Sequence, residues 1–97
     1  MHTARVPRLG TDMPMFMDTH KGTELPDEVN RKVQERVKSG EKDDYGVIDH
    51  GVIIDRDAGE MHCVLEAPDP EAVKRHHEWL KVPLDEHTVH RADAILR

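Results

Sequence analysis

Two apolar patterns, one extended and one helical, alternate along these 97 residues and restrict the folds that the chain can adopt. Residues 15–20, between Pro14 and Lys21-Gly22, and residues 60–66, where apolar and polar side chains alternate, are expected to be strands. Residues 45–55 are rich in β-branched side chains, as strands are. The short connection at residues 56–59 predicts that the second and third of these strands form a hairpin. A last strand is expected at residues 86–91.

Two helices are expected between these strands. Residues 25–39 carry an apolar side chain at every fourth position, which forms one helical stripe of Leu25, Val29, Val33 and Val37. A second helix is expected to begin at Pro70, after Asp69 as its N-cap, and to end at Pro83. The order β-α-β-β-α-β predicts an α+β fold, the ferredoxin-like sandwich, with an antiparallel four-stranded sheet and two helices on one face.

The length predicts one domain, which we place at residues 14–97. Residues 1–13 have no periodicity and are expected to form a flexible N-terminal tail. Phe16, Tyr45 and Trp79 are the only aromatic residues, so the core must be mostly aliphatic and methionine side chains. A core of this kind leaves stability thin, and a homodimer or a bound metal would supplement it.

Charge and cysteine usage indicate the compartment and exclude some partners. The net charge is −6 and no basic cluster is free of acids, which argues against a nucleic-acid partner. Cys63 is the only cysteine, which suits a reducing compartment. No stretch resembles a signal peptide or a membrane span, so we expect a cytoplasmic protein with no membrane partner.

Eight histidines lie in separate segments, and several have carboxylates nearby in the sequence. Neutral imidazole is the commonest protein ligand of transition metals. Strand alternation sorts the candidates by face, and we expect the set with Met15 and Met17 to lie under the helices. The first and third strands are central neighbours in this fold. Asp18 and His20 of the first strand and His62 and Glu66 of the third would therefore meet on the open face of the sheet. The predicted metal ligands are His20, His62, Asp18, Glu66 and His50. Gly51 is a candidate position for a β-bulge and leaves the facing of His50 undecided.

Other polar residues have more ordinary explanations. His76 and His77 lie near an apolar helix face, where histidines are more often core residues hydrogen-bonded to the backbone; the alternative is a ligand or a residue that orients one. Cys63, between Met61 and Leu65, is expected to be inert packing. The histidines match no closed metal-site signature such as CxxC or HExxH, so surface histidines without a role remain an alternative.

Two segments resemble the small nickel-binding, ferredoxin-like protein family, otherwise a domain family of unknown function. They are Phe16-Met17-Asp18-Thr19-His20 and Cys63-Val64-Leu65-Glu66-Ala67-Pro68, the latter followed by Asp69-Pro70-Glu71-Ala72-Val73 and His77. The resemblance implies a βαββαβ fold, homodimers and nickel binding. By position, Asp18, His20, Glu66 and His77 match residues typical of the family, whereas His50 and His62 do not.

The expected function is therefore binding of a divalent metal, nickel first and zinc or copper as alternatives, for sequestration, sensing or delivery. Because imidazole ligands must lose protons, binding is expected to weaken below about pH 6. One alternative is a small dimeric enzyme of the oxygenase or isomerase kind, which predicts an apolar cavity with a buried polar residue. The other is a non-catalytic dimeric interaction module with surface histidines. Metal analysis of untagged protein separates the first possibility from the last.

Overall fold

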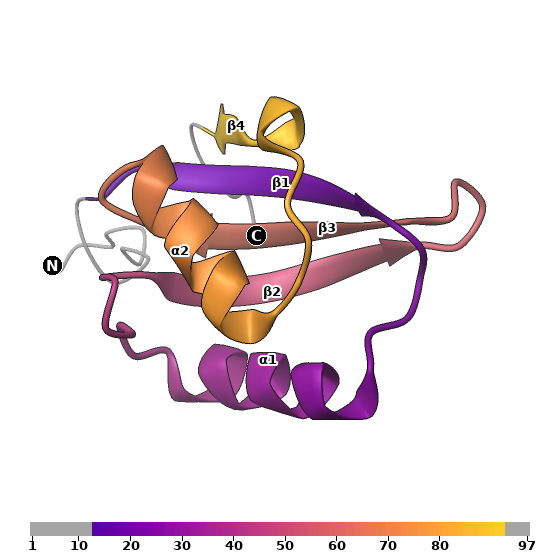
Figure 1. Cartoon of the computed structure of the whole chain (residues 1–97), viewed down its shortest axis with the longest axis horizontal. Helices are drawn as coiled ribbons and strands as arrows, with labels where there is room; N and C mark the ends of the chain where they lie inside the picture. Colours follow the sequence, from indigo (N-terminus) through magenta and orange to yellow (C-terminus); the bar gives the residue numbers. More distant parts are fainter. Residues whose placement is uncertain (1–12, 93–97) are drawn as a thin grey trace, which may run out of the picture.

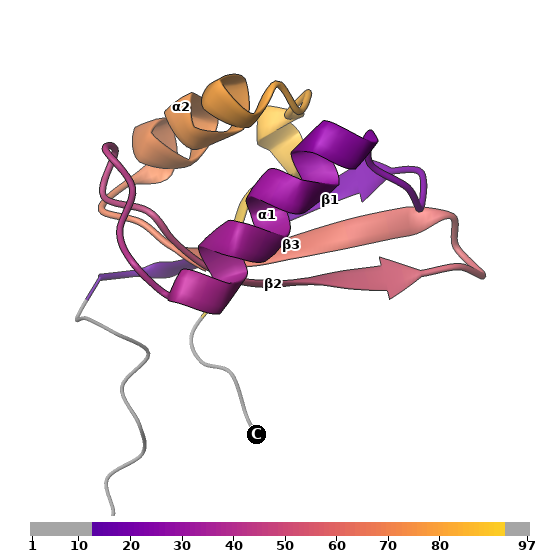
Figure 2. The same cartoon turned by 90° about the horizontal axis from the view of Figure 1, so that it is seen from below.

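Four strands and two helices form two layers in this structure, a computed structural model that describes residues 13–92. The elements are β1 (Met15–Lys21), α1 (Asp27–Ser39), β2 (Ile48–Asp55), β3 (Glu60–Glu66), α2 (Pro70–Leu80), the 3-10 turn η1 (Glu86–Thr88) and β4 (His90–Ala92). The strands form one antiparallel sheet in the order β2-β3-β1-β4 (Figure 1). Both helices lie on the same side of it (Figure 2). This arrangement confirms the ferredoxin-like α+β fold.

The expected tail at residues 1–13 stays a prediction, because residues 1–12 lie outside the described part of the chain. Within the described part, neither helix has the length and apolar character needed to cross a bilayer.

The helix ends follow from local chemistry. Asp69 caps α2, because its side chain accepts a hydrogen bond of 2.8 Å from the backbone N–H of Ala72. Pro70 fits the first position of that helix, where its missing N–H costs nothing. Gly40 ends α1 in the left-handed conformation, with φ of 66°. Its N–H donates to the carbonyl of Arg36.

Two strands are shorter than their apolar patterns predict. β2 begins at Ile48 rather than at residue 45, because Asp43 Oδ1 accepts the N–H groups of Tyr45 and Val47 at 2.9 Å each and folds this segment into a turn. β4 begins at His90 rather than at residue 86, because residues 86–88 form η1. Side-chain hydrogen bonds of this kind compete with a strand ladder and leave no trace in the apolar pattern.

A β-bulge interrupts β2, as Gly51 led us to expect. The register passes from Asp49 opposite Leu65 directly to Gly51 opposite Val64, so His50 is the extra residue. The bulge lets His50 face away from the helices while its neighbour Asp49 faces them. The facing of His50, undecided from the sequence, is thereby settled.

The core lies between the sheet and α2. Its buried apolar cluster includes Phe16 of β1, Leu65 of β3 and Val73 of α2. Since Phe16 packs under α2, the side chains two and four positions later in β1, Asp18 and His20, also face the helices. This alternation sets the position of the polar cluster described next.

Candidate metal centre

Four side chains that can bind a metal meet between the sheet and α2: Asp18, His20, Cys63 and His77. Each offers one ligand atom, and these atoms all lie within 4.8 Å of one another. Asp18 and Cys63 are directly opposite each other in the β1–β3 ladder, and His20 follows Asp18 on the same face of β1. His77 comes down from α2, and its ring stacks on that of His20 with centroids 5.2 Å apart.

Backbone carbonyls determine which nitrogen of each imidazole points into the cluster. His20 Nδ1 lies 3.0 Å from the carbonyl oxygen of Pro83, and His77 Nδ1 lies 2.8 Å from that of Val73. A carbonyl oxygen can only accept, so each Nδ1 carries the proton and donates it. In a neutral imidazole the other nitrogen, Nε2, is then an unprotonated acceptor, which is the form that binds metals.

Both Nε2 atoms are directed at the same buried carboxylate. His77 Nε2 lies 3.3 Å from Asp18 Oδ1, and His20 Nε2 contacts the same oxygen. Neither Asp18 oxygen, nor His20 Nε2, has a hydrogen bond of acceptable geometry within the described residues. Asp18 has no exposed surface and His77 is only 2 % exposed. Three acceptors that face one another without solvent repel unless a proton or a metal ion lies between them.

The pKa values of this group show that the cluster favours positive charge. Burial alone would raise the pKa of Asp18, but the contacts with His20 and His77 outweigh it and lower the pKa to about 2. The contact with Asp18 raises the pKa of His20 above its ordinary 6.5, although burial opposes this. Asp18 is therefore a carboxylate at neutral pH, and its contact favours the protonated form of His20 when no metal is bound.

Cys63 supplies a sulfur ligand that must first lose its proton. Burial raises the pKa of its thiol, and the charges of Asp18 and Asp49 raise it further. A divalent cation beside the sulfur reverses this effect, because a coordinated thiol is deprotonated. Two imidazole nitrogens, one carboxylate oxygen and one thiolate form a mixed N, O and S set, which suits nickel, zinc or copper and does not suit magnesium or calcium.

The expectation that Asp18 and His20 lie on the open face of the sheet is wrong. Met15, Met17 and Thr19 face away from the helices, whereas Phe16, Asp18 and His20 face them. Methionine and phenylalanine are both apolar, so alternation in β1 alone left the two facings open. The aromatic ring of Phe16 fills the core, and α2 supplies His77 as a partner for the polar residues that follow.

His50, His62 and Glu66 therefore lie on the face of the sheet opposite the cluster and do not share a centre with Asp18 and His20. His50 Nε2 contacts Glu66 Oε2 at 2.6 Å, and Glu66 is only 1 % exposed. His62 Nδ1 lies 3.0 Å from the hydroxyl of Thr19. The structure thus divides the five predicted ligands into two separate groups.

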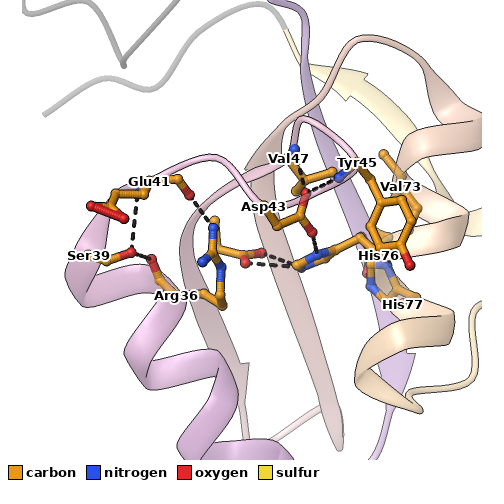
Figure 3. Close-up of polar contacts among 11 residues, drawn as sticks. Arg36, Ser39, Glu41, Asp43, Tyr45, Val47, Val73, His76 and His77 are labelled. Atoms are coloured by element: carbon orange, nitrogen blue, oxygen red, sulfur yellow. Dashed lines mark hydrogen bonds and ion pairs between the residues drawn. The ribbon is translucent and has the colours of Figure 1, made fainter.

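His76 belongs to a different network from its neighbour His77. Its Nδ1 lies 2.5 Å from Asp43 Oδ2 (Figure 3), and its Nε2 lies 3.0 Å from Asp49 Oδ1. Both partners are carboxylates, so the ring donates from both nitrogens as an imidazolium. Burial lowers the pKa of His76, but the bonds to Asp49 and Asp43 outweigh it and raise the pKa above 6.5. His76 thus links the segment before β2, β2 itself and α2, and it holds the helix that carries His77.

Cys63 is the cluster residue that sequence analysis assigned to inert packing. Its expected position under the helices, between Met61 and Leu65, is correct. The missing information was that Asp18, directly opposite in the ladder, points the same way. Asp18 and His20 point toward the helices because Phe16 does. If this facing of β1 had been known, the sequence alone would have grouped Asp18 and His20 with Cys63.

Comparisons with known proteins agree with this fold and point to nickel. The sequence model of a family described as "Nickel responsive protein SCO4226-like" matches residues 16–89. A solved structure titled "Crystal structure analysis of SCO4226 from Streptomyces coelicolor A3(2)" is similar, with 28 % identity and a TM-score of 0.61. The match covers 84 % of this chain and 99 % of that one. Comparison with curated proteins gives no match.

Proposed function

The chain belongs to the family of nickel-responsive, SCO4226-like proteins, and from this premise we propose that it binds nickel(II) through Asp18, His20, Cys63 and His77. The observation that carries the proposal is the convergence of the Nε2 atoms of His20 and His77 on the buried carboxylate of Asp18. A cation at this point satisfies all three acceptors at once, and the sulfur of Cys63 completes four ligands.

The site supports holding a metal rather than turning over a substrate. Four protein ligands from β1, β3 and α2 form a closed set, as in structural and storage sites, whereas catalytic metal sites keep one position for substrate or water. Sequestration, sensing and delivery of nickel are the roles that such a site serves. The burial of the ligands favours slow release of the ion.

Nickel titration of untagged protein tests the site. We expect one nickel ion per chain in this cluster and, for His20→Ala and His77→Ala, a loss of affinity of about a hundredfold or more, because even residues that only orient ligands are worth 10- to 100-fold. The matched control is the double variant His50→Ala, His62→Ala, which removes the two imidazoles of the opposite face. Retained affinity in both cluster variants, or loss in the control alone, would place the ion elsewhere.

We also propose that the chain forms the homodimer expected from its sequence. The face of the sheet without helices carries Ile53, which is 56 % exposed, opposite His62 in the β2–β3 ladder. Met17 and Val64 pair on the same face and are only half-buried, so this face offers a partner subunit more than one apolar side chain. Sedimentation of the wild-type protein should give a dimer and Ile53→Glu a monomer; a wild-type monomer at high concentration contradicts the proposal.

A further inference from the structure

A groove lies between α1 and the edge strand β2, and the described side chains do not fill it. Of the apolar stripe along α1, only Val29 is buried, whereas Val33 and Val37 are half-buried. These two line a cavity of about 670 Å³, whose other wall includes Val52 and Ile54 of β2. Close-packed interiors do not leave apolar spaces of this size. The groove is therefore a surface on which another chain can pack.

The groove follows a free edge of the sheet. β2 pairs with β3 on one side and, among the described residues, with no strand on the other. After the bulge at His50, residues 51–55 pair regularly with β3, so this part of the edge can accept a further strand. Figure 1 shows α1 beyond the β2 edge, and Figure 2 shows it on the helix side of the sheet. A strand added to β2 would lie beside α1 and direct alternate side chains into the groove.

The two ends of the groove differ in charge. Glu24 and Asp27 lie at the start of α1, near Arg56, whose hairpin is hydrogen-bonded to the loop before that helix, so one negative charge is in excess there. Lys38 lies at the other end of α1, about 16 Å further along the helix axis. About five residues of extended chain span this distance. That is also the length of the regular part of the β2 edge at residues 51–55.

The wall formed by α1 is polar as well as apolar. Asn30 and Gln34 line the groove, and Gln34 Nε2 donates a hydrogen bond of 3.2 Å to Asn30 Oδ1. A side-chain amide offers donors and an acceptor, as a peptide group does. An apolar molecule in the groove would take these amides and the β2 edge away from water without replacing their hydrogen bonds, which is unfavourable. A peptide can contact the apolar walls and also satisfy the polar groups.

We propose that the groove between α1 and β2 binds an extended peptide segment of a partner protein, added antiparallel to β2. Its backbone pairs with residues 51–55, and its alternate apolar side chains occupy the space beneath α1. A basic residue at its amino end meets the acidic end of the groove, and an acidic residue at its carboxyl end meets Lys38. Strand addition of this kind takes affinity from main-chain hydrogen bonds and specificity from the pockets for alternate side chains. None of the four proposed nickel ligands lines this groove, so the inference is independent of the metal site.

A capped synthetic peptide, Lys-Val-Thr-Val-Thr-Val-Glu, tests the proposal by calorimetric titration. Alternate N–H groups of a strand point to opposite edges, so N-methylation of the valines alone and of the threonines alone removes donors from one edge at a time. We expect one of these two peptides to bind at least tenfold more weakly and the other to bind within threefold of the parent. The peptide with its two charged residues exchanged should bind several-fold more weakly. Equal losses from both methylated peptides, or no binding of the parent, would overturn the inference.

Substitutions in β2 provide a second measurement with a matched control. Ile54→Lys places a charge in the groove and should weaken peptide binding at least tenfold. Ile53→Lys makes the same change at the next residue, which is also exposed but lies on the opposite face of the sheet, and should leave peptide binding within threefold. Nickel affinity should stay within threefold in both variants, so the two proposals fail separately. Equal peptide affinity of wild type and Ile54→Lys would contradict the groove.

The amides of α1 can be tested in the same way. The double variant Asn30→Ala, Gln34→Ala should weaken peptide binding several-fold. Its control is Arg31→Ala, Glu35→Ala, which removes a pair with the same spacing on the exposed side of the same helix. If Ile54→Lys instead converts a dimer to a monomer in sedimentation, a second copy of this chain occupies the edge and the proposal of a partner peptide is wrong.

Discussion

Nε2 of His77 lies 3.3 Å from Oδ1 of Asp18, and both side chains are almost completely withdrawn from water. A helix residue and a strand residue that are far apart in the sequence thus form one electrostatic unit. The unit stabilises the fold only while Asp18 is ionised, and this makes the acid stability of the protein a test of the cluster.

The metal-free protein should lose stability in acid as Asp18 is protonated. Its pKa is about 2 in the folded protein against 3.8 for an ordinary aspartate, so the stabilisation is complete above pH 3.8 and disappears as the pH falls through about 2. The difference corresponds to about 2 kcal/mol in the free energy of unfolding. Urea unfolding between pH 5 and pH 2 measures it. Asp18→Asn should flatten this part of the curve; an unchanged slope in that variant contradicts the assignment.

Nickel affinity should decrease as the pH is lowered, and the decrease should steepen at a higher pH than the pKa of an unperturbed histidine predicts. The pKa of His20 is raised above 6.5, and Cys63 is a thiol throughout the neutral range because its pKa is raised too. Nickel must displace the proton of Cys63 at any pH in that range and also that of His20 below its pKa. We expect affinity to change about tenfold per pH unit above the pKa of His20 and about a hundredfold below it.

The steeper, hundredfold loss is therefore expected to begin above pH 6.5, the ordinary pKa of histidine, and not below about pH 6 as the sequence suggested. Calorimetric titrations from pH 5.5 to pH 8.5 in a weakly chelating buffer give the slope. His50→Ala is the control, because this imidazole lies on the opposite face and should leave the slope unchanged. Equal affinity at pH 5.5 and pH 7.5 would exclude ligation by His20 and Cys63.

Cys63→Ser should remove the sulfur-to-nickel charge-transfer absorption while the fold is retained. Serine has nearly the same shape as cysteine, but its hydroxyl does not become an anionic ligand at neutral pH as a coordinated thiol does. We expect nickel affinity to fall by about tenfold or more, in the range known for weakened metal sites. The near-ultraviolet difference spectrum of nickel-loaded against metal-free protein measures the band. The same band in Cys63→Ser would show that sulfur is not a ligand.

The order of elements could be predicted from the sequence because each element carries its own signal. The four-residue repeat of Val29 and Val33 predicts α1, and the pair Asp69 and Pro70 predicts the start of α2. The bulge in β2 was predicted in the same way, from Gly51 within a β-branched run. Each of these signals depends only on a few neighbouring residues, so it can be recognised in the sequence without knowledge of tertiary contacts.

The facing of β1 could not be predicted in this way, because it depends on contacts with distant residues. Met15 and Phe16 are both apolar enough for the core, and the choice between them is decided by packing of Phe16 against Leu65. Burial of Asp18 is favourable only because His20 and His77 contact it, and His77 comes from the distant helix α2. A shift of one residue in facing moves every side chain of a strand to the other side of the sheet. Because the facing of β1 was assigned incorrectly, the predicted site combined residues that lie on opposite faces of the sheet.

His76→Ala should destabilise the protein by about 3–5 kcal/mol, the cost of leaving buried charges without their partner. Asp43 and Asp49 lose the imidazolium between them, and α2 loses its link to the segment before β2. Because the pKa of His76 is raised above 6.5 in the folded protein, its contribution is complete below pH 6.5 and is lost as the pH rises through the raised value. The wild-type protein should thus unfold at lower urea concentration at pH 9 than at pH 6, and His76→Gln should reduce this difference.

Figure 3 shows that Asp43 also accepts the N–H groups of Tyr45 and Val47, so Asp43→Asn keeps the turn but weakens the charge pair. If Asp43→Asn and His76→Gln leave the pH dependence of unfolding as it is in the wild type, His76 is not an imidazolium in the folded protein.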